Sequence, residues 1–184
     1  MAITTFVAGD VLTAAQLNGS FTTAGGLQFI KAQTIGNAVS SVTVSSAFSA
    51  TYDNYRIIVN GGASSASIED LNMTLGSTSA GYYWAQNGRT YANADSSAAG
   101  SNTSSWRAGN TSSDAINMCT DVFSPFLADQ TSFSTVKSFA ATNGAFYSGG
   151  GYLNDATSYT AFTLTPNSGT LTGGTIRVYG YRNS

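Results

Sequence analysis

The sequence predicts an all-β fold, and three observations carry the prediction. Residues 55–60 alternate strictly, with Tyr55, Ile57 and Val59 on one face, a polar turn before them and a Gly pair after them. Residues 173–182, which read GGTIRVYGYR, form a counterpart at the far end of the chain, and we interpret both as central strands. Turn-forming residues such as Asn143-Gly144 separate short apolar runs, as in antiparallel hairpins. Together these features favour an antiparallel two-sheet sandwich of the jelly-roll type.

The remaining strands are expected at fairly even spacing. Residues 86–113 are almost wholly Ala, Ser, Asn, Gly and Thr, and we expect a long surface loop or excursion there, with some extended structure. No repeat with a period of 20–50 residues is present, which argues against a β-helix or a propeller. Alternating apolar residues predict strands at 27–34, 42–48, 55–60, 69–75, 82–84, 115–123, 135–141, 145–152, 160–165 and 175–181.

The first 26 residues differ from the body of the chain. Thr13 and Gln16 have the spacing of a capping box, and Asn18-Gly19 is a suitable stop, so one helical turn is expected between them. So short a helix is unstable alone in water, and it must dock on something. The sequence therefore divides into an N-terminal attachment arm and linker, residues 1–26, and a β-sandwich domain, residues 27–184.

The composition excludes several classes of function. The chain has no histidine and one cysteine, which excludes a Ser-His-Asp triad, a Cys-His dyad and an ordinary zinc site. The seven Lys and Arg residues are scattered from Lys31 to Arg182 and form no patch that would bind nucleic acid. No apolar run is long enough for a transmembrane helix, so membrane insertion is not expected. Cys119, inside the predicted strand 115–123, is interpreted as a small buried residue.

Carboxylates are the remaining candidates for chemistry. Two placed carboxylates suffice for glycoside hydrolysis, but most acidic residues here stand at turns, where Asp bonds the backbone. Glu69 and Asp70 are consecutive in a strand and are expected on opposite faces. No segment has the spacing of an EF-hand Ca²⁺ loop, although a Ca²⁺ held by carbonyls and one or two Asp stays open. We therefore expect no catalytic residue, no metal ligand and no cofactor, with a paired-carboxylate glycan depolymerase as the weakest alternative.

A group of aromatic residues is the candidate for ligand binding. Tyr83, Tyr91, Trp106 and Arg107 stand among Ser, Gly and Asn, the composition of binding loops in which rigid rings anchor and small polar residues adapt. An exposed Trp also suits stacking on a sugar ring. The alternative is that Trp84 belongs to the core and Trp106 pins a loop to the sandwich, and both interpretations are open from sequence.

Residues 6–18 carry a motif that points to a family. They read FVAGDVLTAAQLN, which resembles the F-x-A-G-x-x-L-T-A-A-x-x-N opening of many tailed-bacteriophage virion proteins, tail fibres among them. The ending GGTIRVYGYR is similar to the closing strand of phage tail and capsid-surface β-domains. In that family the short leader commonly precedes a β-rich and often trimeric distal domain. Family members often continue the leader with a longer helix, whereas this chain continues into a Ser/Thr/Gly linker.

The resemblance implies a location on the virion surface, at the tail or capsid, and assembly as a homotrimer. The apolar residues of the arm, Phe6, Val11, Leu12 and Leu17, are then the expected anchor to other virion proteins. Charged residues make up only 9 % of the chain, which suits broad neutral contacts between subunits or with glycans.

Two non-enzymatic functions follow from these expectations. The first is a trimeric tail-fibre or surface domain involved in host attachment through a bacterial surface glycan. The alternative is a capsid or tail decoration protein that contacts only neighbouring virion subunits. The aromatic group favours the first, and the shortness of the chain favours the second.

Overall fold

The structure is a computed structural model that describes residues 9, 11, 13, 26–139 and 144–183, and these residues contain strands and no helix. The predicted all-β, antiparallel architecture is confirmed. The helical turn expected from Thr13 onwards falls outside the described residues except for Thr13 itself, which is not helical. The strands are β1 (Leu27–Thr34), β2 (Val42–Val44), β3 (Asn54–Asn60), β4 (Ala63–Ser64), β5 (Ile68–Leu75), β6 (Tyr82–Thr90), β7 (Asp95–Thr103), β8 (Trp106–Ser112), β9 (Ile116–Phe123), β10 (Ser132–Ser138), β11 (Ala145–Leu153), β12 (Phe162–Pro166), β13 (Leu171–Thr172) and β14 (Thr175–Tyr181).

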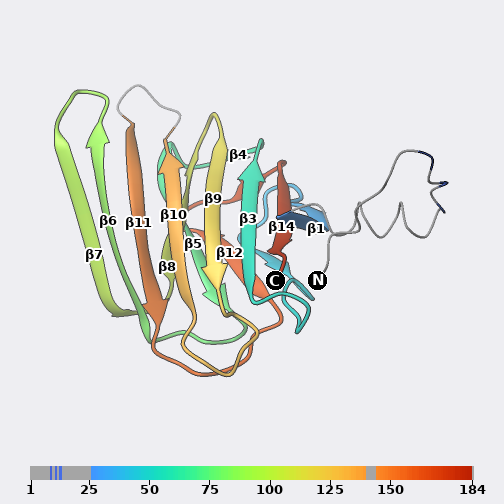
Figure 1. Ribbon diagram of the computed structural model, residues 1–184. Coiled ribbons are helices and arrows are strands. Elements are labelled where there is room, and N and C mark those ends of the chain that lie inside the picture. Colours follow the sequence, from blue (N-terminus) through green and yellow to red (C-terminus); the bar gives the residue numbers. More distant parts are fainter. Residues whose placement is uncertain (1–8, 10, 12, 14–25, 140–143, 184) are drawn as a thin grey trace.

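Strand pairing is nested from the ends of the domain inward. β1 pairs with β14, β2 with β12, β3 with β9 and β5 with β8, all antiparallel. Pairings of β14 with β3 and of β12 with β5 join these pairs into two runs, β1-β14-β3-β9 and β2-β12-β5-β8. The β8–β9 hairpin connects the runs, and in Figure 1 the second run lies behind the first.

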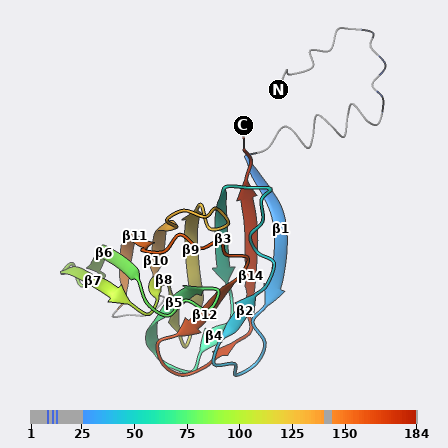
Figure 2. The ribbon, with the colours of Figure 1, turned by 90° about the horizontal axis from the view of Figure 1, so that it is seen from below.

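Two hairpins widen the first run beyond β9. The β10–β11 hairpin follows β9, the β6–β7 hairpin comes between β5 and β8 in sequence, and together they continue the sheet in the order β9-β10-β11-β6-β7. We call β10, β11, β6 and β7 the extension. Figure 1 shows the extension reaching past the second run, and Figure 2 shows β6 and β7 projecting from the body.

The two strands interpreted as central are neighbours in the first run. β14 pairs with β3 over six residue pairs, from Thr175 with Asn60 to Gly180 with Tyr55. Both are internal, because β1 covers the other edge of β14 and β9 covers that of β3. Their alternating apolar residues are buried as expected.

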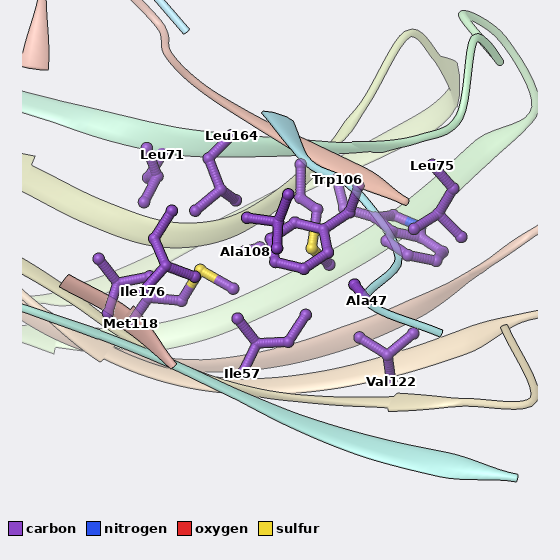
Figure 3. Packing of buried hydrophobic residues seen from close by; sticks show 14 of the residues in the cluster. Ala47, Ile57, Leu71, Leu75, Trp106, Ala108, Met118, Val122, Leu164 and Ile176 are labelled. Carbon is purple, nitrogen blue, oxygen red and sulfur yellow. The ribbon is translucent and has the colours of Figure 1, made fainter. Parts of the chain in front are cut away.

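The apolar core lies between the two runs. Side chains that point inward from one run meet those that point inward from the other, and Figure 3 shows this packing. The labelled residues of β5, β8 and β12 (Leu71, Leu75, Trp106, Ala108, Leu164) face those of β3, β9 and β14 (Ile57, Met118, Val122, Ile176).

Along one edge of β8, side chains rather than a neighbouring strand donate the hydrogen bonds to its carbonyls. β8 pairs with β9 only near the hairpin turn, so several of its carbonyls would otherwise be buried without partners. Thr120 and Thr135 donate hydroxyl hydrogen bonds to the Ala108 carbonyl at 2.9 and 2.6 Å, and the Lys137 ammonium donates to the Arg107 carbonyl at 3.2 Å. Each unpartnered carbonyl would cost about 1–3 kcal/mol, so these side chains stabilise the contact between β8 and the first run.

The expectation of a long loop at 86–113 is wrong, because the extended structure expected within it makes up most of the segment, as parts of β6, β7 and β8. β7 reads DSSAAGSNT and has no aromatic or aliphatic β-branched residue, so its sequence lacks the usual strand signal. It is nevertheless paired with β6 from Arg89–Asp95 to Tyr82–Thr103. Backbone pairing with a neighbour, rather than side-chain propensity, makes it a strand.

The predicted burial of Cys119 is also wrong. β9 points Met118, Thr120 and Val122 inward, so Cys119 takes an outward position and is exposed. Since side chains alternate between the two faces of a strand, an error of one residue in phase reverses the burial of a side chain.

Candidate functional site

A cleft opens where the extension passes the edge of the second run. It has a volume of about 290 Å³ and receives side chains from β5, β6, β7, β8 and β11. The inward positions of β7, such as Ser96 and Ala98, remain partly exposed there. The residues that line it are Ile68, Glu69, Asp70, Gln86, Ser96, Ala98, Arg107, Phe139 and Tyr147.

Asp70 and Arg107 form the floor of the cleft and belong to a charged cluster that includes the buried Lys137. The Asp70 carboxylate bridges two cations: Lys137 Nζ lies 3.0 Å from Oδ1, and Arg107 Nη1 lies 2.9 Å from Oδ2. The Lys137 side chain is fully buried, and this burial lowers its pKa, while the charge of Asp70 and its hydrogen bond act in the opposite direction. The cluster is held by β5, β8 and β10 together.

Arg107 lies beside an irregularity in β8. The register between β5 and β8 shifts at Leu71 and Asn72, so Ala108 has no opposite residue in β5. Around this bulge Trp106 and Ala108 are buried, whereas Arg107 is only partly buried and lines the cleft.

The Arg107 guanidinium is held from a second side by an aromatic ring. Its Cζ lies 4.6 Å from the centroid of the Trp84 ring, within cation–π range. The indole is itself fixed, because Trp84 Nε1 donates to Thr103 Oγ1 at 3.1 Å. Gly100 leaves room for this ring, since a Cβ at that position would collide with the indole nitrogen.

Gln86 places a buried side-chain oxygen in the cleft without a hydrogen-bond donor from the described residues. Its side chain comes from the inward face of β6 and the residue is 7 % exposed, yet Oε1 has no hydrogen-bond partner among the described residues. An unpartnered buried acceptor of this kind costs about 1–3 kcal/mol. A buried polar atom without a partner is rare in native proteins, so its position in a cleft suggests a functional role.

The opposite wall of the cleft carries aromatic and hydroxyl groups. The Tyr147 hydroxyl is 2.9 Å from Ser96 Oγ, a hydrogen bond that ties β11 to β7 across β6. The Tyr147 ring meets Phe139 edge to face, with ring centroids 6.1 Å apart. The wall thus combines an apolar ring surface with hydroxyls at its edge.

Glu69 is engaged outside the floor of the cleft. Ser168 Oγ donates to Glu69 Oε1 at 2.6 Å, and Asn167 Nδ2 donates to Oε2 at 3.0 Å. With Asp70 bonded to two cations, both carboxylates at the cleft already accept hydrogen bonds. The arrangement offers an amide, a guanidinium, hydroxyls and aromatic rings, which suits hydrogen bonding to a polar ligand.

Trp106, a predicted ligand-binding residue, lies in the core. It is 0 % exposed, stacks on Phe133 with centroids 4.6 Å apart and meets Tyr82 edge to face at 5.2 Å. Its Nε1 donates to the Tyr152 carbonyl at 3.2 Å. A side chain so enclosed cannot stack on a sugar at the surface, because the protein already covers both faces of the ring.

The other predicted ligand-binding residues lie apart from one another. Tyr83 points outward from β6 and stacks on Tyr152, with ring centroids 4.9 Å apart and planes within 4°. Tyr91 follows β6, is 56 % exposed and donates its hydroxyl to the Phe139 carbonyl at 3.2 Å. Of the predicted set, Arg107 lines the cleft.

Sequence reasoning missed Gln86, Ser96 and Tyr147. The alternation of Trp84 and Gln86 along one face continues the pattern of the predicted strand 82–84, and this was the available signal. No pattern in the sequence around Ser96 indicated its role, because its position in the cleft depends on the pairing of β7 with β6.

Another carboxylate, that of Asp121, forms an ion pair with Arg56 on the outward face of the first run. Arg56 donates two hydrogen bonds to Asp121, at 2.8 and 2.7 Å, and the Tyr181 hydroxyl donates a third at 2.7 Å. Burial raises the pKa of Asp121, but the bonds from Arg56 and Tyr181 together outweigh burial, so the pKa lies below its ordinary value. These contacts join β3, β9 and β14.

The predicted anchor residues Phe6, Leu12 and Leu17 lie outside the described residues, and Val11 is 90 % exposed. Within the described part of the chain, no three His, Cys, Asp or Glu side chains gather closely enough to hold a metal ion. No helix in that part is long and apolar enough to cross a membrane.

Comparison with protein-family models, curated proteins and solved structures finds no match. Inference about function therefore begins from the motif, the fold and the cleft.

Proposed function

We propose that the chain is a non-enzymatic structural protein of a bacteriophage virion, a trimeric tail-fibre or surface domain that contacts the host. In this proposal the arm, residues 1–26, attaches to other virion proteins, and the domain, residues 27–184, forms a jelly-roll sandwich. Its ligand is a bacterial surface glycan. The nested strand pairing is the observation that carries the proposal.

The nesting supports a jelly roll because of how the chain alternates between the two runs. β1 and β3 belong to the first run and β2 and β5 to the second, while β8 and β12 return to the second run and β9 and β14 to the first. A long hairpin rolled up once gives this order, and viral capsid and lectin domains are built on it. Since a fold alone does not define a function, the phage-like motif at residues 6–18 supplies the link to the virion.

The state of the carboxylates favours binding over catalysis. Asp70 bridges Lys137 and Arg107, and Glu69 accepts bonds from Asn167 and Ser168. A retaining or inverting glycosidase needs two carboxylates placed on either side of a sugar bond. These two have partners of their own, which makes the depolymerase alternative the least supported.

Deleting residues 1–20 is expected to leave a folded, soluble domain that no longer enters particles. The reason is that the first strand among the described residues begins at Leu27, so the deletion removes none of the strands that form the domain. Thermal melting of the purified protein and the protein content of purified particles are the two measurements. Thr22→Ala serves as the control in the linker and should be incorporated normally. Normal incorporation of the truncated chain would contradict the anchor assignment.

Light scattering of the purified chain is expected to give about three times the monomer mass of 18.9 kDa. Phe29, Val136 and Phe146 are exposed apolar residues of the first run and the extension, and such residues favour contacts between subunits. A stable interface should bury more than roughly 1,000 Å² per pair. A mass near 18.9 kDa at all micromolar concentrations would refute the trimer.

Decoration of the capsid or tail is the second candidate function. The same exposed apolar residues favour it, since a protein that contacts only its neighbours would also cover them. Adsorption of particles to host cells separates the two functions. Host attachment requires that a variant altered in the cleft, such as Arg107→Met, reduces adsorption, whereas a decoration protein would leave adsorption unchanged.

A further inference from the structure

We propose that the cleft between the extension and the second run binds one neutral, hydroxyl-rich pyranose ring. The inference deepens the proposed function, on which it rests for the source of the sugar, because it names where a host glycan would bind. Gln86, the balance of charge around Asp70 and the aromatic wall support it.

The amide of Gln86 has a hydrogen-bond acceptor that the described residues leave unsatisfied. The side chain is more than nine-tenths buried, lines the cleft and leaves Oε1 without a partner among the described residues. Rotation about the last side-chain torsion exchanges oxygen and nitrogen, so the amide can offer an acceptor or two donors to an occupant. A sugar hydroxyl, which both donates and accepts, matches either orientation.

Arg107 is held in place at the cleft. Asp70 holds its Nη1 and its Cζ lies over the Trp84 ring, so the guanidinium is positioned before any ligand arrives. A guanidinium carries five N–H groups, and the contact with Asp70 is made through Nη1. The remaining donors belong to a side chain that is partly exposed at the cleft, where they meet the oxygen atoms of an occupant.

The charge of the site favours a neutral ligand. Arg107 and Lys137 contribute two positive charges, and Asp70 and Glu69 contribute two negative charges. Because Asp70 lies directly between the two cations, an anion entering the cleft would find no unpaired positive charge. A hydroxylated ligand gains hydrogen bonds without this limitation.

The aromatic wall and the size of the cleft narrow the ligand further. Tyr147 is fixed by its hydrogen bond to Ser96 and by its T-shaped contact with Phe139, and its ring offers an apolar surface to the C–H face of a sugar. A volume of about 290 Å³ is at the lower limit for small-molecule sites, so it accommodates one ring of a longer glycan.

The test is an NMR titration of the purified, full-length, ¹⁵N-labelled chain. The probes are the methyl glycosides of glucose, galactose, mannose and N-acetylglucosamine, with N-acetylneuraminic acid and inorganic phosphate as charged comparisons. We expect saturable shifts of β6, β7 and β8 amides with at least one neutral glycoside, and weaker or no response to the charged probes. Absence of saturable shifts with all four neutral glycosides, or tighter binding of a charged probe, would overturn the proposal.

Variants separate binding from structure. Gln86→Leu should weaken binding about ten-fold or more while leaving the melting temperature unchanged or higher, because it removes an unsatisfied buried acceptor. Asn87→Leu, an exposed neighbour on the outward side of β6, is the matched control and should bind normally. Ser96→Ala and Arg107→Met test the same site if Gln86→Leu does not fold. Wild-type affinity in all of the cleft variants that fold would refute the site.

This experiment is independent of particle assembly. A chain that binds a glycoside but fails the arm-deletion test would retain the sugar site and lose the virion assignment. A chain that passes the arm-deletion test but binds no neutral glycoside would remain a virion protein without this site.

Discussion

Replacing Trp106 with Ala is expected to lower the free energy of unfolding by about 3–5 kcal/mol. The indole is 0 % exposed and packs between strands of both runs and the extension, against Phe133 and Tyr82. Its removal leaves a cavity and also frees the Tyr152 carbonyl, which accepts the indole N–H at 3.2 Å. For a chain of this length the melting temperature should fall by roughly 6–20 °C.

Thermal and denaturant unfolding measure this effect, with Tyr91→Ala as the control because Tyr91 is an exposed aromatic of the same segment. The control should change stability little. Any loss of adsorption by Trp106→Ala particles should follow the loss of folded protein, since the ring does not reach the surface. A melting temperature equal to that of the wild type would contradict its place in the core.

Replacing Asp70 with Asn is expected to cost about 3–5 kcal/mol, because it leaves the buried Lys137 ammonium without its counter-charge. Lys137 is fully buried and approaches the carboxylate to 3.0 Å, and its other acceptors are the carbonyls of Arg107 and Gly109. Asp95→Asn is the matched control, since its ion pair with Arg89 is exposed and should contribute no measurable stability. The double variant Asp70→Asn, Lys137→Met should recover most of the loss, because no unpaired charge remains buried.

The cost of Asp70→Asn should depend on pH in a direction fixed by Lys137. Burial lowers the pKa of Lys137 from its ordinary 10.5, and loss of Asp70 removes an interaction that opposes this change. Between the folded and unfolded pKa values the unfolded chain binds more protons, so stability rises with pH in that window. The variant should therefore approach the wild type as the pH rises towards 10.5. A stability difference that is constant or grows with pH would contradict this account.

The predictable strands were those whose side chains alternate in size and polarity. Tyr55, Ile57 and Val59 point to one face, and no other secondary structure buries all three. β7 carries no such signal, because Ala, Ser and Gly give no apolar face, and only its pairing with β6 makes it a strand. Trp106 was ambiguous for a related reason: it is buried opposite Met73, and that position depends on the pairing of β8 with β5.

The cleft was only partly accessible to sequence reasoning. Arg107 stood out as a charge among small polar residues, but Gln86, Ser96 and Tyr147 did not. Tyr147 is close to Ser96 because β11 and β7 pair with opposite edges of β6, and no local pattern encodes that neighbourhood. A site assembled from strands distant in sequence becomes visible once the order of the strands is known.

The nested pairing has a consequence for how the protein is made on the ribosome. Among the described strands β1 is synthesised first and its pairing partner β14 last, so β1 must wait until the strands between them have been made. Hairpins such as β8–β9 and β10–β11 can form from nearby residues, whereas closure of β1 on β14 requires a long-range contact with a high loop-closure entropy. Folding of such a topology is slow, and the exposed edge of β14 or β1 before closure is a site for pairing with a neighbouring nascent chain.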